Sequence, residues 1–305
     1  MAETIRTTAE KIRKLQLQGA RNVAIAAVKA IQTQAQQTTA KNKAAFIAEL
    51  IEAQTIFVAS RETEPLMRNA IRWIITQAQA AKTQKVDALS QNVVENANQF
   101  LKDLEGSKEQ IAEIGANRIR DGSVVFTHCH SSTVTRLLAK AKADGKNFKV
   151  ICTETRPAYQ GRITANELLG LGIETTFIVD SAARSFMGNV DMVIVGADAI
   201  TSEGNVVNKI GSSSIAVIAH EARVPFYVVS ELLKFDPETL RGECEKIEQR
   251  SPAEVWIEAP ARLDVRNPAF DVTPNRYIHG IVCEEGIIAP QSVVEIIRLR
   301  YPWVF

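Results

Sequence analysis

The residues with the clearest chemical potential form a histidine-flanked turn around Cys129, within residues 127–134 (THCHSSTV). The turn follows an apolar, β-branched run at 123–126 and precedes a helical pattern that begins near Leu137. This order predicts a strand, a tight turn and a helix, and in open α/β sheets such turns border the ligand crevice. Backbone N–H groups at a helix start attract anions and favour the thiolate form of a nearby cysteine. The alternative is a small buried cysteine that behaves as a hydrophobic side chain.

A carboxylate at another strand end supports the chemical interpretation. Asp198 comes shortly after the apolar run 192–195, whose composition is typical of a strand buried on both faces. A carboxyl group at the mouth of an apolar crevice can have a raised pKa, which suits general acid–base catalysis. The alternative for Asp198 is a turn residue or a helix cap.

A polar cluster directly follows another predicted strand. It comprises Glu154, Arg156, Gln160 and Arg162. Arginine presents a planar fork that suits phosphate or carboxylate groups, and binding residues are common on loops that a rigid scaffold positions. The alternative is a solvated loop with a surface ion pair.

The segment 204–214 combines Asn208, Lys209 and Gly211 with several hydroxyl side chains at an expected helix start. This combination predicts a phosphate seat. The segment does not match GxxxxGK[ST], and the chain contains no GxGxxG, so neither a Walker A loop nor a dinucleotide-binding fingerprint is indicated. The cysteine and histidines of the turn lack the spacing of a zinc site, and we expect no metal.

The elements that must position these side chains change type near residue 120. Residues 1–118 show helical periodicity, with helices expected at 43–60, 64–81 and 86–119 and a loop or frayed helix end at 32–39. Further along, strands are expected at 123–127, 148–153, 174–179, 190–196, 225–229 and 278–283, and helices at 136–143, 164–171, 181–187, 213–221 and 293–300. The predicted fold class is α/β: an N-terminal helical domain (1–118) followed by a Rossmann-like, doubly wound parallel-sheet domain (119–305).

Composition excludes several classes of protein. The 305 residues carry a net charge of +1, from 36 basic and 35 acidic residues, so no strong field favours nucleic acid or an anionic membrane. No apolar run is long enough for a membrane span, and the N-terminus lacks the apolar core of a targeting peptide. The four cysteines, Cys129, Cys152, Cys244 and Cys283, fit neither a disulfide framework nor a CxxC site. We therefore expect a reducing cytoplasm.

Taken together, the motifs resemble those of a known superfamily. It holds ribose-1,5-bisphosphate isomerase, methylthioribose-1-phosphate isomerase and the regulatory alpha, beta and delta subunits of eukaryotic initiation factor 2B. The resemblance runs from Gly19 to the C-terminus. It is carried by residues 127–131, 154–157 with Gln160 and Gly161, 180–183, 195–198, 208–211 and 270–274.

Within this superfamily the chain is most similar to the archaeal ribose-1,5-bisphosphate isomerases. Their catalytic pair is a cysteine in the histidine-flanked turn and an aspartate after Gly-Ala, and Cys129 and Asp198 occupy these positions. The regulatory subunits generally lack that cysteine. The resemblance implies a substrate pocket formed by Gly19, Ala20, Arg21, Arg61, Arg68, Ser131, Arg156, Gln160, Asn208 and Lys209.

Two positions depart from the isomerase pattern. Gln18 precedes Gly-Ala where the isomerases usually have arginine, and Glu62 replaces the proline of their Arg-Pro-Thr motif. Arg21 or Arg68 would compensate. These departures favour an alternative function, that of a non-catalytic archaeal homologue of the alpha-type regulatory subunit that engages translation initiation factor 2.

For the isomerase, the resemblance implies conversion of ribose 1,5-bisphosphate to ribulose 1,5-bisphosphate without metal or organic cofactor. The C1 phosphate blocks ordinary ring opening, so a protonated Asp198 would assist at the ring oxygen. Cys129 would then move the C2 proton or guide a hydride shift. Two phosphates need two anion seats, and one is expected at Asn208 and Lys209. The other is expected at Arg61 with an arginine of the helical domain, which puts the site between the domains.

The resemblance also implies a dimer built through the C-terminal domain, often stacked into a hexamer. The apolar, aromatic tail at 296–305 is compatible with such an assembly, since a monomer must either bury or expose it. The alternative is that the tail packs on its own domain.

Overall fold

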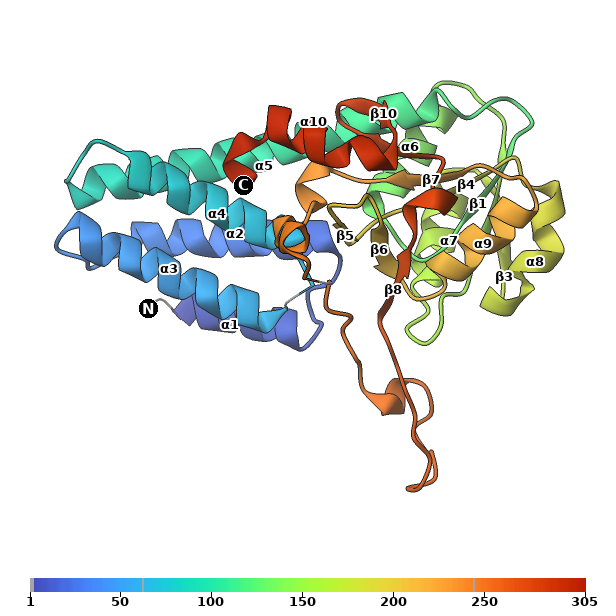
Figure 1. The fold of residues 1–305 in the computed structure, drawn as a ribbon, viewed down its shortest axis with the longest axis horizontal. Helices are drawn as coiled ribbons and strands as arrows, with labels where there is room; N and C mark the ends of the chain where they lie inside the picture. Colours follow the sequence, from blue (N-terminus) through green and yellow to red (C-terminus); the bar gives the residue numbers. More distant parts are fainter. Residues whose placement is uncertain (1–2, 62, 244) are drawn as a thin grey trace.

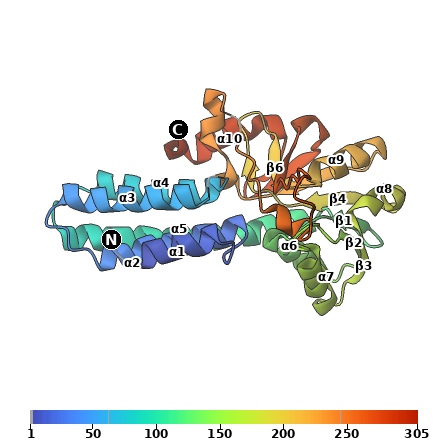
Figure 2. The same cartoon turned by 90° about the horizontal axis from the view of Figure 1, so that it is seen from below.

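The computed structural model describes residues 3–61, 63–243 and 245–305. Glu62 and Cys244, which entered the sequence analysis, lie outside these residues. Five helices come first and lie side by side at one end of the molecule (Figures 1 and 2). They are α1 (Glu3–Arg13), α2 (Ala20–Gln36), α3 (Lys43–Ser60), α4 (Pro65–Ala80) and α5 (Val86–Ala116).

The helices form where apolar side chains recur every three or four residues. In α2, for example, Val23, Ala27 and Ile31 are fully buried, because this spacing puts them on one face. The Asn42 side chain accepts a hydrogen bond from the backbone N–H of Ala45 and caps α3. The predicted break at 32–39 was wrong in its first half, since α2 continues to residue 36; residues 32–36 are mostly Gln and Ala, which favour helix.

A seven-stranded sheet fills the other half of the molecule, in the order β10-β9-β7-β4-β1-β2-β3. Its first six strands in the chain run parallel, and β10 is antiparallel to β9. The strands are β1 (Val124–Thr127), β2 (Lys149–Thr153), β3 (Glu174–Ile178), β4 (Met192–Val195), β7 (Phe226–Val229), β9 (Gly280–Cys283) and β10 (Gly286–Ile288). The order 3-2-1-4 reverses direction beside β1, as in doubly wound folds, and ligand crevices lie at that reversal. The predicted α/β fold class is confirmed.

Helices cover both faces of this sheet. Side chains of α5, α6 (Ser132–Ala143) and α7 (Gly161–Gly170) share one buried cluster with the sheet. Side chains of the remaining helices share another cluster with the opposite face: α8 (Ala183–Phe186), α9 (Ser212–Glu221) and α10 (Val293–Arg300). Strands buried on both faces explain the nearly continuous apolar runs of the sequence.

A small antiparallel sheet, which the sequence analysis did not predict, lies beside the large one. It contains β5 (Ala199–Ile200), β6 (Val206–Lys209) and β8 (Phe270–Thr273). Asn208 and Lys209 are therefore strand residues paired with β8, and α9 begins only at Ser212. Asp271 of β8 accepts hydrogen bonds from the backbone N–H groups of Gly211 and Ser213, so β8 also caps the start of α9.

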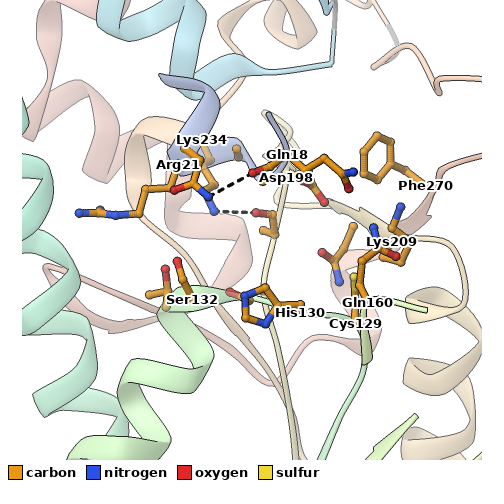
Figure 3. Close-up of a pocket in the computed structure, with 18 of the residues that line it drawn as sticks. Gln18, Arg21, Cys129, His130, Ser132, Gln160, Asp198, Lys209, Lys234 and Phe270 are labelled. Carbon is orange, nitrogen blue, oxygen red and sulfur yellow. Dashed lines mark hydrogen bonds between the residues drawn. The ribbon is translucent and has the colours of Figure 1, made fainter. Parts of the chain in front are cut away.

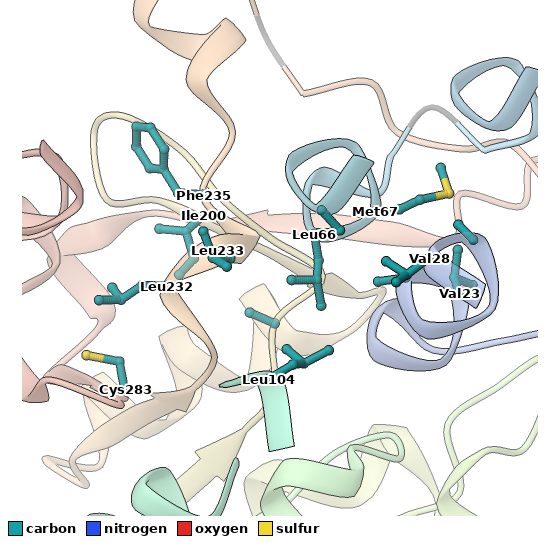
Figure 4. Close-up of a cluster of buried hydrophobic side chains, with 14 of the residues drawn as sticks. Val23, Val28, Leu66, Met67, Leu104, Ile200, Leu232, Leu233, Phe235 and Cys283 are labelled. Atoms are coloured by element: carbon teal, nitrogen blue, oxygen red, sulfur yellow. The ribbon is translucent and has the colours of Figure 1, made fainter. Parts of the chain in front are cut away.

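One continuous core joins the helical bundle to the sheet. Figure 4 shows Val23, Leu66 and Leu104 of the bundle beside Leu232 and Ile200 of the second half. Helix α5 belongs to both parts, because its first half packs in the bundle core and its last two turns pack on α6 and the sheet. A domain boundary near residue 118 stays a prediction.

Two segments lie outside the helical bundle and the layers of the sheet domain, and they behave differently. Residues 245–268, here called the arm, project away from it and are crossed at their base by a hydrogen bond from Arg250 N to Asn267 O (2.9 Å) (Figure 1). Near the tip, Ile257 is 86% exposed. The C-terminal tail instead folds onto the bundle, with Trp303 against Trp73 of α4 at a ring distance of 5.1 Å. The aromatic tail is thus accommodated within one chain.

Candidate active site

A cavity of about 410 Å³ opens where the carboxyl ends of β1 and β4 face the start of α2. Figure 3 shows side chains from both halves of the chain pointing into it. The structure brings ten of the twelve predicted site residues to its walls: Gly19, Ala20, Arg21, Arg61, Cys129, Ser131, Gln160, Asp198, Asn208 and Lys209. The cavity lies beside β1, where the strand order reverses.

Cys129 is held in a strained backbone conformation at the end of β1. Its φ is +68°, in the left-handed region that non-glycine residues rarely adopt. Its backbone N–H donates to Thr155 Oγ1 at 2.9 Å, and its carbonyl accepts from Thr164 Oγ1 at 2.8 Å. Hydrogen bonds with the loop after β2 and with α7 thus fix the backbone that carries the thiol.

His128 also holds this turn in place, through contacts of both its ring nitrogens. It is buried, with Nδ1 2.6 Å from Thr153 Oγ1 and Nε2 2.8 Å from the carbonyl oxygen of Ile210. Burial lowers the pKa of His128, so the ring is neutral; it donates from Nε2, because a carbonyl can only accept, and accepts at Nδ1. Gly211 allows this approach, since a Cβ there would lie 3.1 Å from the ring.

The ionisation expected for Cys129 was wrong. Burial raises the pKa of the thiol to about 11, although Lys209 and a backbone N–H bond from His130 act in the opposite direction. The solvation that a thiolate would lose in this site outweighs the stabilisation that the single lysine and the helix start provide. In the free protein Cys129 is therefore a neutral thiol at pH 7.

Asp198 follows β4 on a connection that passes close to the start of α6. Its backbone N–H donates to Val207 O at 2.9 Å, which ties it to the small sheet. The nearby Gly196 is required by packing, because a Cβ there would lie 2.7 Å from Ser131 Oγ. Lys234, which follows β7, donates from Nζ to Ala197 O at 2.7 Å. The carboxyl group thus shares the cavity with a buried ammonium group.

Two helix starts converge on the cavity. Helix α2 begins at Ala20 after Gly19, whose φ of +83° turns the chain and which offers no capping side chain. Helix α6 begins after Ser131, which caps it with its hydroxyl. Both starts line the cavity. Unpaired N–H groups at helix starts attract anions, so both starts present backbone donors to the cavity, although the Ser131 hydroxyl already accepts from one of them.

Basic side chains surround these helix starts. Five cationic residues line the cavity against one carboxylate, Asp198, among the described residues: Arg21, Arg61, Lys209, Lys234 and Arg250. They are positioned rather than free. Arg21 Nη1 donates to Leu104 O at 2.8 Å and to Glu231 Oε1 at 3.1 Å, and Lys209 Nζ lies 4.9 Å from the ring centre of Phe270. The cavity is suited to a polyanion with at least two negative groups.

Two predicted substrate residues lie outside this cavity. Arg68 pairs with Asp236 at 3.1 Å and Glu238 at 3.2 Å on another part of the surface. Arg156 donates to Tyr159 Oη and to Val255 O of the arm. Both guanidinium groups already bind other groups: two carboxylates in the case of Arg68, and a hydroxyl and a carbonyl in the case of Arg156. The structure therefore does not bring them to the cavity. The polar cluster after β2 contributes only Gln160 to its walls.

Lys234 and Arg250 were missed in the sequence. Lys234 belongs to the turn after β7, so the rule that site residues follow parallel strands would have found it. Arg250 had no such signal, because it lies in the arm, whose path no periodicity indicates. Among residues 3–61, 63–243 and 245–305 there is no group of three potential metal ligands. Within the same ranges, no helix has the length and hydropathy needed to cross a bilayer.

Comparisons with known proteins agree with this geometry. The model of the Initiation factor 2 subunit family matches residues 16–290. The ribose 1,5-bisphosphate isomerase of Pyrococcus furiosus is 41% identical and aligns over 97% of this chain and 94% of its own. That of Methanocaldococcus jannaschii is 40% identical, with 99% and 97% covered. The crystal structure of Pyrococcus horikoshii translation initiation factor eIF-2B superposes with a TM-score of 0.83 at 32% identity, over 95% of this chain and 98% of that one.

Proposed function

This chain belongs to the initiation factor 2 subunit family, and within it we propose that it is an isomerase that converts ribose 1,5-bisphosphate to ribulose 1,5-bisphosphate. The observation that carries the proposal is the pairing of a thiol and a carboxyl group, Cys129 and Asp198, in one cavity that two helix starts and five cations make attractive to a bisphosphate. Non-catalytic docking of a protein would require neither group.

The reaction moves one hydrogen from C2 to C1 and opens the sugar ring. Asp198 donates a proton to the ring oxygen as the bond between C1 and that oxygen breaks. In one route Cys129 removes the proton from C2, the resulting enol is protonated at C1, and the C2 hydroxyl loses its proton to become the ketone. In the other route the C2 hydrogen migrates to C1 as hydride, guided by Cys129, while the C2 hydroxyl gives its proton to the Asp198 carboxylate and becomes the ketone. Because the free thiol is neutral, the first route requires that it give its proton to the Asp198 carboxylate, which is left ionised after ring opening. Lys209 favours that ionisation, whereas the negative charge of a bound bisphosphate opposes it.

The two phosphates are assigned to opposite walls. One lies at the start of α2 with Arg21 and Arg61, and the other lies at the start of α6 with Lys209. Charge-assisted hydrogen bonds of this kind are about twice as strong as neutral ones. Arg61→Ala and Lys209→Ala should therefore each raise KM for the bisphosphate by at least tenfold, as measured by steady-state kinetics.

The decisive experiment is to incubate the purified protein with ribose 1,5-bisphosphate and assay the ketose. Deuterium at C1 after reaction in D₂O would establish proton transfer, because hydride migration incorporates none. A thermal shift gives an independent measure, because a ligand at 100 times its Kd adds about 2.7 kcal/mol to the folded state. No ketose and no shift, together with co-purification of initiation factor 2, would support the regulatory alternative instead.

We further propose a homo-oligomeric, cytoplasmic enzyme. The exposed apolar residues of the arm, Trp256, Ile257 and Leu263, support self-association better than the C-terminal tail, which packs on α4. Light scattering at micromolar concentration tests this part of the proposal, and a monomer there would refute it. The widely spaced cysteines fit a reducing compartment.

A further inference from the structure

A buried carboxyl group lies directly behind the cavity wall. Glu64 immediately precedes α4 and is fully buried. Neither of its carboxylate oxygens has a hydrogen-bond partner among the described residues. A buried carboxylate without hydrogen bonds is costly and needs a specific reason to persist. Its nearest charged partner is Arg61, with Nη1 at 3.2 Å from Oε1.

Arg61 connects this carboxyl group to the substrate cavity. The guanidinium group lines the cavity and lies 5.8 Å from the ring centre of Phe270. On its other side Nε lies 3.6 Å from Glu248 Oε2, at the base of the arm. Neither Nε nor Nη1 makes a hydrogen bond within the described part of the chain. One arginine is thus shared by two carboxylates at ion-pair distance, and the two nitrogens that face them are buried without a hydrogen-bond partner among the residues that the structure describes.

Four charged groups face Glu64, each from a different element. Arg61 follows α3, Asp198 follows β4, Lys234 follows β7 and Glu248 begins the arm. Burial raises the pKa of Glu64 to about 7, with Asp198 and Glu248 adding to the rise and Arg61 and Lys234 opposing it. A small change in the surrounding charge is therefore enough to alter its protonation near neutral pH.

We propose that Glu64 takes up a proton when the anionic substrate binds at Arg61, and that it thereby acts as a positioning residue that makes this arginine available to a phosphate. The inference rests on the proposed function, because it places a phosphate group beside Arg61. In the free protein the ionised Glu64 holds the guanidinium group in place. When a phosphate arrives, its negative charge repels the buried carboxylate and takes part of the attraction of Arg61. Protonation removes the repulsion and leaves the guanidinium charge to be shared only by Glu248 and the ligand.

The proposal predicts a specific pH dependence of binding. Below neutral pH Glu64 already carries its proton, and binding takes up none at this residue. Above neutral pH each bound ligand must first draw a proton from solvent, so affinity falls by up to about tenfold per pH unit. The phosphates and Asp198 also contribute to any pH dependence, so the part due to Glu64 has to be isolated with a variant.

The test is isothermal titration calorimetry with ribose 1,5-bisphosphate at pH 7.5, in buffers of different ionisation enthalpy. The Cys129→Ser background prevents turnover. We expect an uptake of roughly half a proton per site at Glu64, which Glu64→Gln removes. A matched control is Glu245→Gln: this carboxyl is also buried beside an arginine, Arg68, but away from the cavity, and its loss should leave the uptake unchanged.

Each outcome is decisive. Equal proton uptake in the Glu64→Gln variant and its parent would overturn the proposal, whatever the net uptake of the parent. Failure of the parent to bind the bisphosphate would instead contradict the proposed function. If Glu64→Gln does not fold, Glu64→Asp provides the comparison in infrared difference spectra: substrate must then produce in the parent the C=O band of a buried protonated carboxyl group, and that band must shift in frequency in the Asp variant. In the turnover-competent protein, Glu64→Gln should flatten the pH profile of kcat/KM above neutral pH, which a merely structural role would not produce.

Discussion

Single side chains decide whether this cavity is reactive, and Cys129 shows how strongly burial matters. Its place after β1 identifies the residue in the sequence, and the helix start there predicts a thiolate. That expectation counted the helix start and ignored the loss of solvent, which dominates in the structure. The same limit applies to Arg68 and Arg156. Their type suits phosphate, but only the structure shows that they already have other partners.

The catalytic roles predict that Cys129→Ser and Asp198→Asn each lower kcat by about 10²–10⁴-fold. Both replacements are close in shape to the native side chains, so melting temperatures should change by only a few degrees. Steady-state assays together with thermal melts check this. A useful control is Cys152→Ala, because this cysteine is buried within β2 and does not line the cavity. Activity close to that of the unmodified protein in either catalytic variant would remove that residue from the mechanism.

The raised pKa of Cys129 predicts slow alkylation at neutral pH. Since only the thiolate reacts, the rate of modification by iodoacetamide should climb about tenfold per pH unit between pH 7 and pH 10. Peptide mass spectrometry resolves Cys129 from the other cysteines. Lys209→Ala should slow the reaction further, because this ammonium group favours the thiolate. Fast modification of Cys129 at pH 7 would show that the thiol is already ionised.

At the scale of elements, the long patterns were predictable and the short ones were not. The helices from Lys43 to Ala116 and the parallel strands each repeat a period often enough to be identified. The small sheet could not be predicted from the sequence, because β5 has two residues and β6 follows it after a tight turn. Its existence depends on pairing with β8, more than 60 residues later, where Lys209 faces Phe270. The sequence around β5 and β6 does not indicate a pairing strand so far along the chain.

The turn between β6 and α9 predicts a stability effect. Gly211 has a φ of +104°, and an added Cβ would press on the His128 ring at 3.1 Å. Gly211→Ala should therefore lower the free energy of unfolding by about 1–3 kcal/mol and disturb the Cys129 turn. Denaturant unfolding measures the loss. The matched control is Gly170→Ala at the exposed end of α7, where nothing lies within 4 Å and the change should be neutral or slightly stabilising. Equal effects at the two glycines would contradict the argument.

At the scale of the whole molecule, buried acids make stability depend on pH. Burial raises the pKa of Glu245 to about 9 from an ordinary value of 4.5. The folded protein thus binds more protons than the unfolded chain between these values, so its stability falls as pH rises through them. Glu245→Gln should raise the melting temperature at pH 8 and change it little at pH 4.5. The exposed Glu52→Gln should do neither. Thermal melts at the two pH values decide, and a pH-independent effect of Glu245→Gln would count against the burial argument.

The division of the cavity between two distant stretches of chain has a consequence for synthesis. On the ribosome, Arg21 and Arg61 emerge early and can take their places in the helical bundle. Their partners Glu231 and Glu248 follow only some two hundred residues later. Throughout that interval the two guanidinium groups have only their partners within the bundle, Glu105 and Glu64, and the cavity has no opposite wall. The cavity is therefore among the last parts of the molecule to be completed, and metabolite binding cannot assist folding until translation of the chain is almost finished.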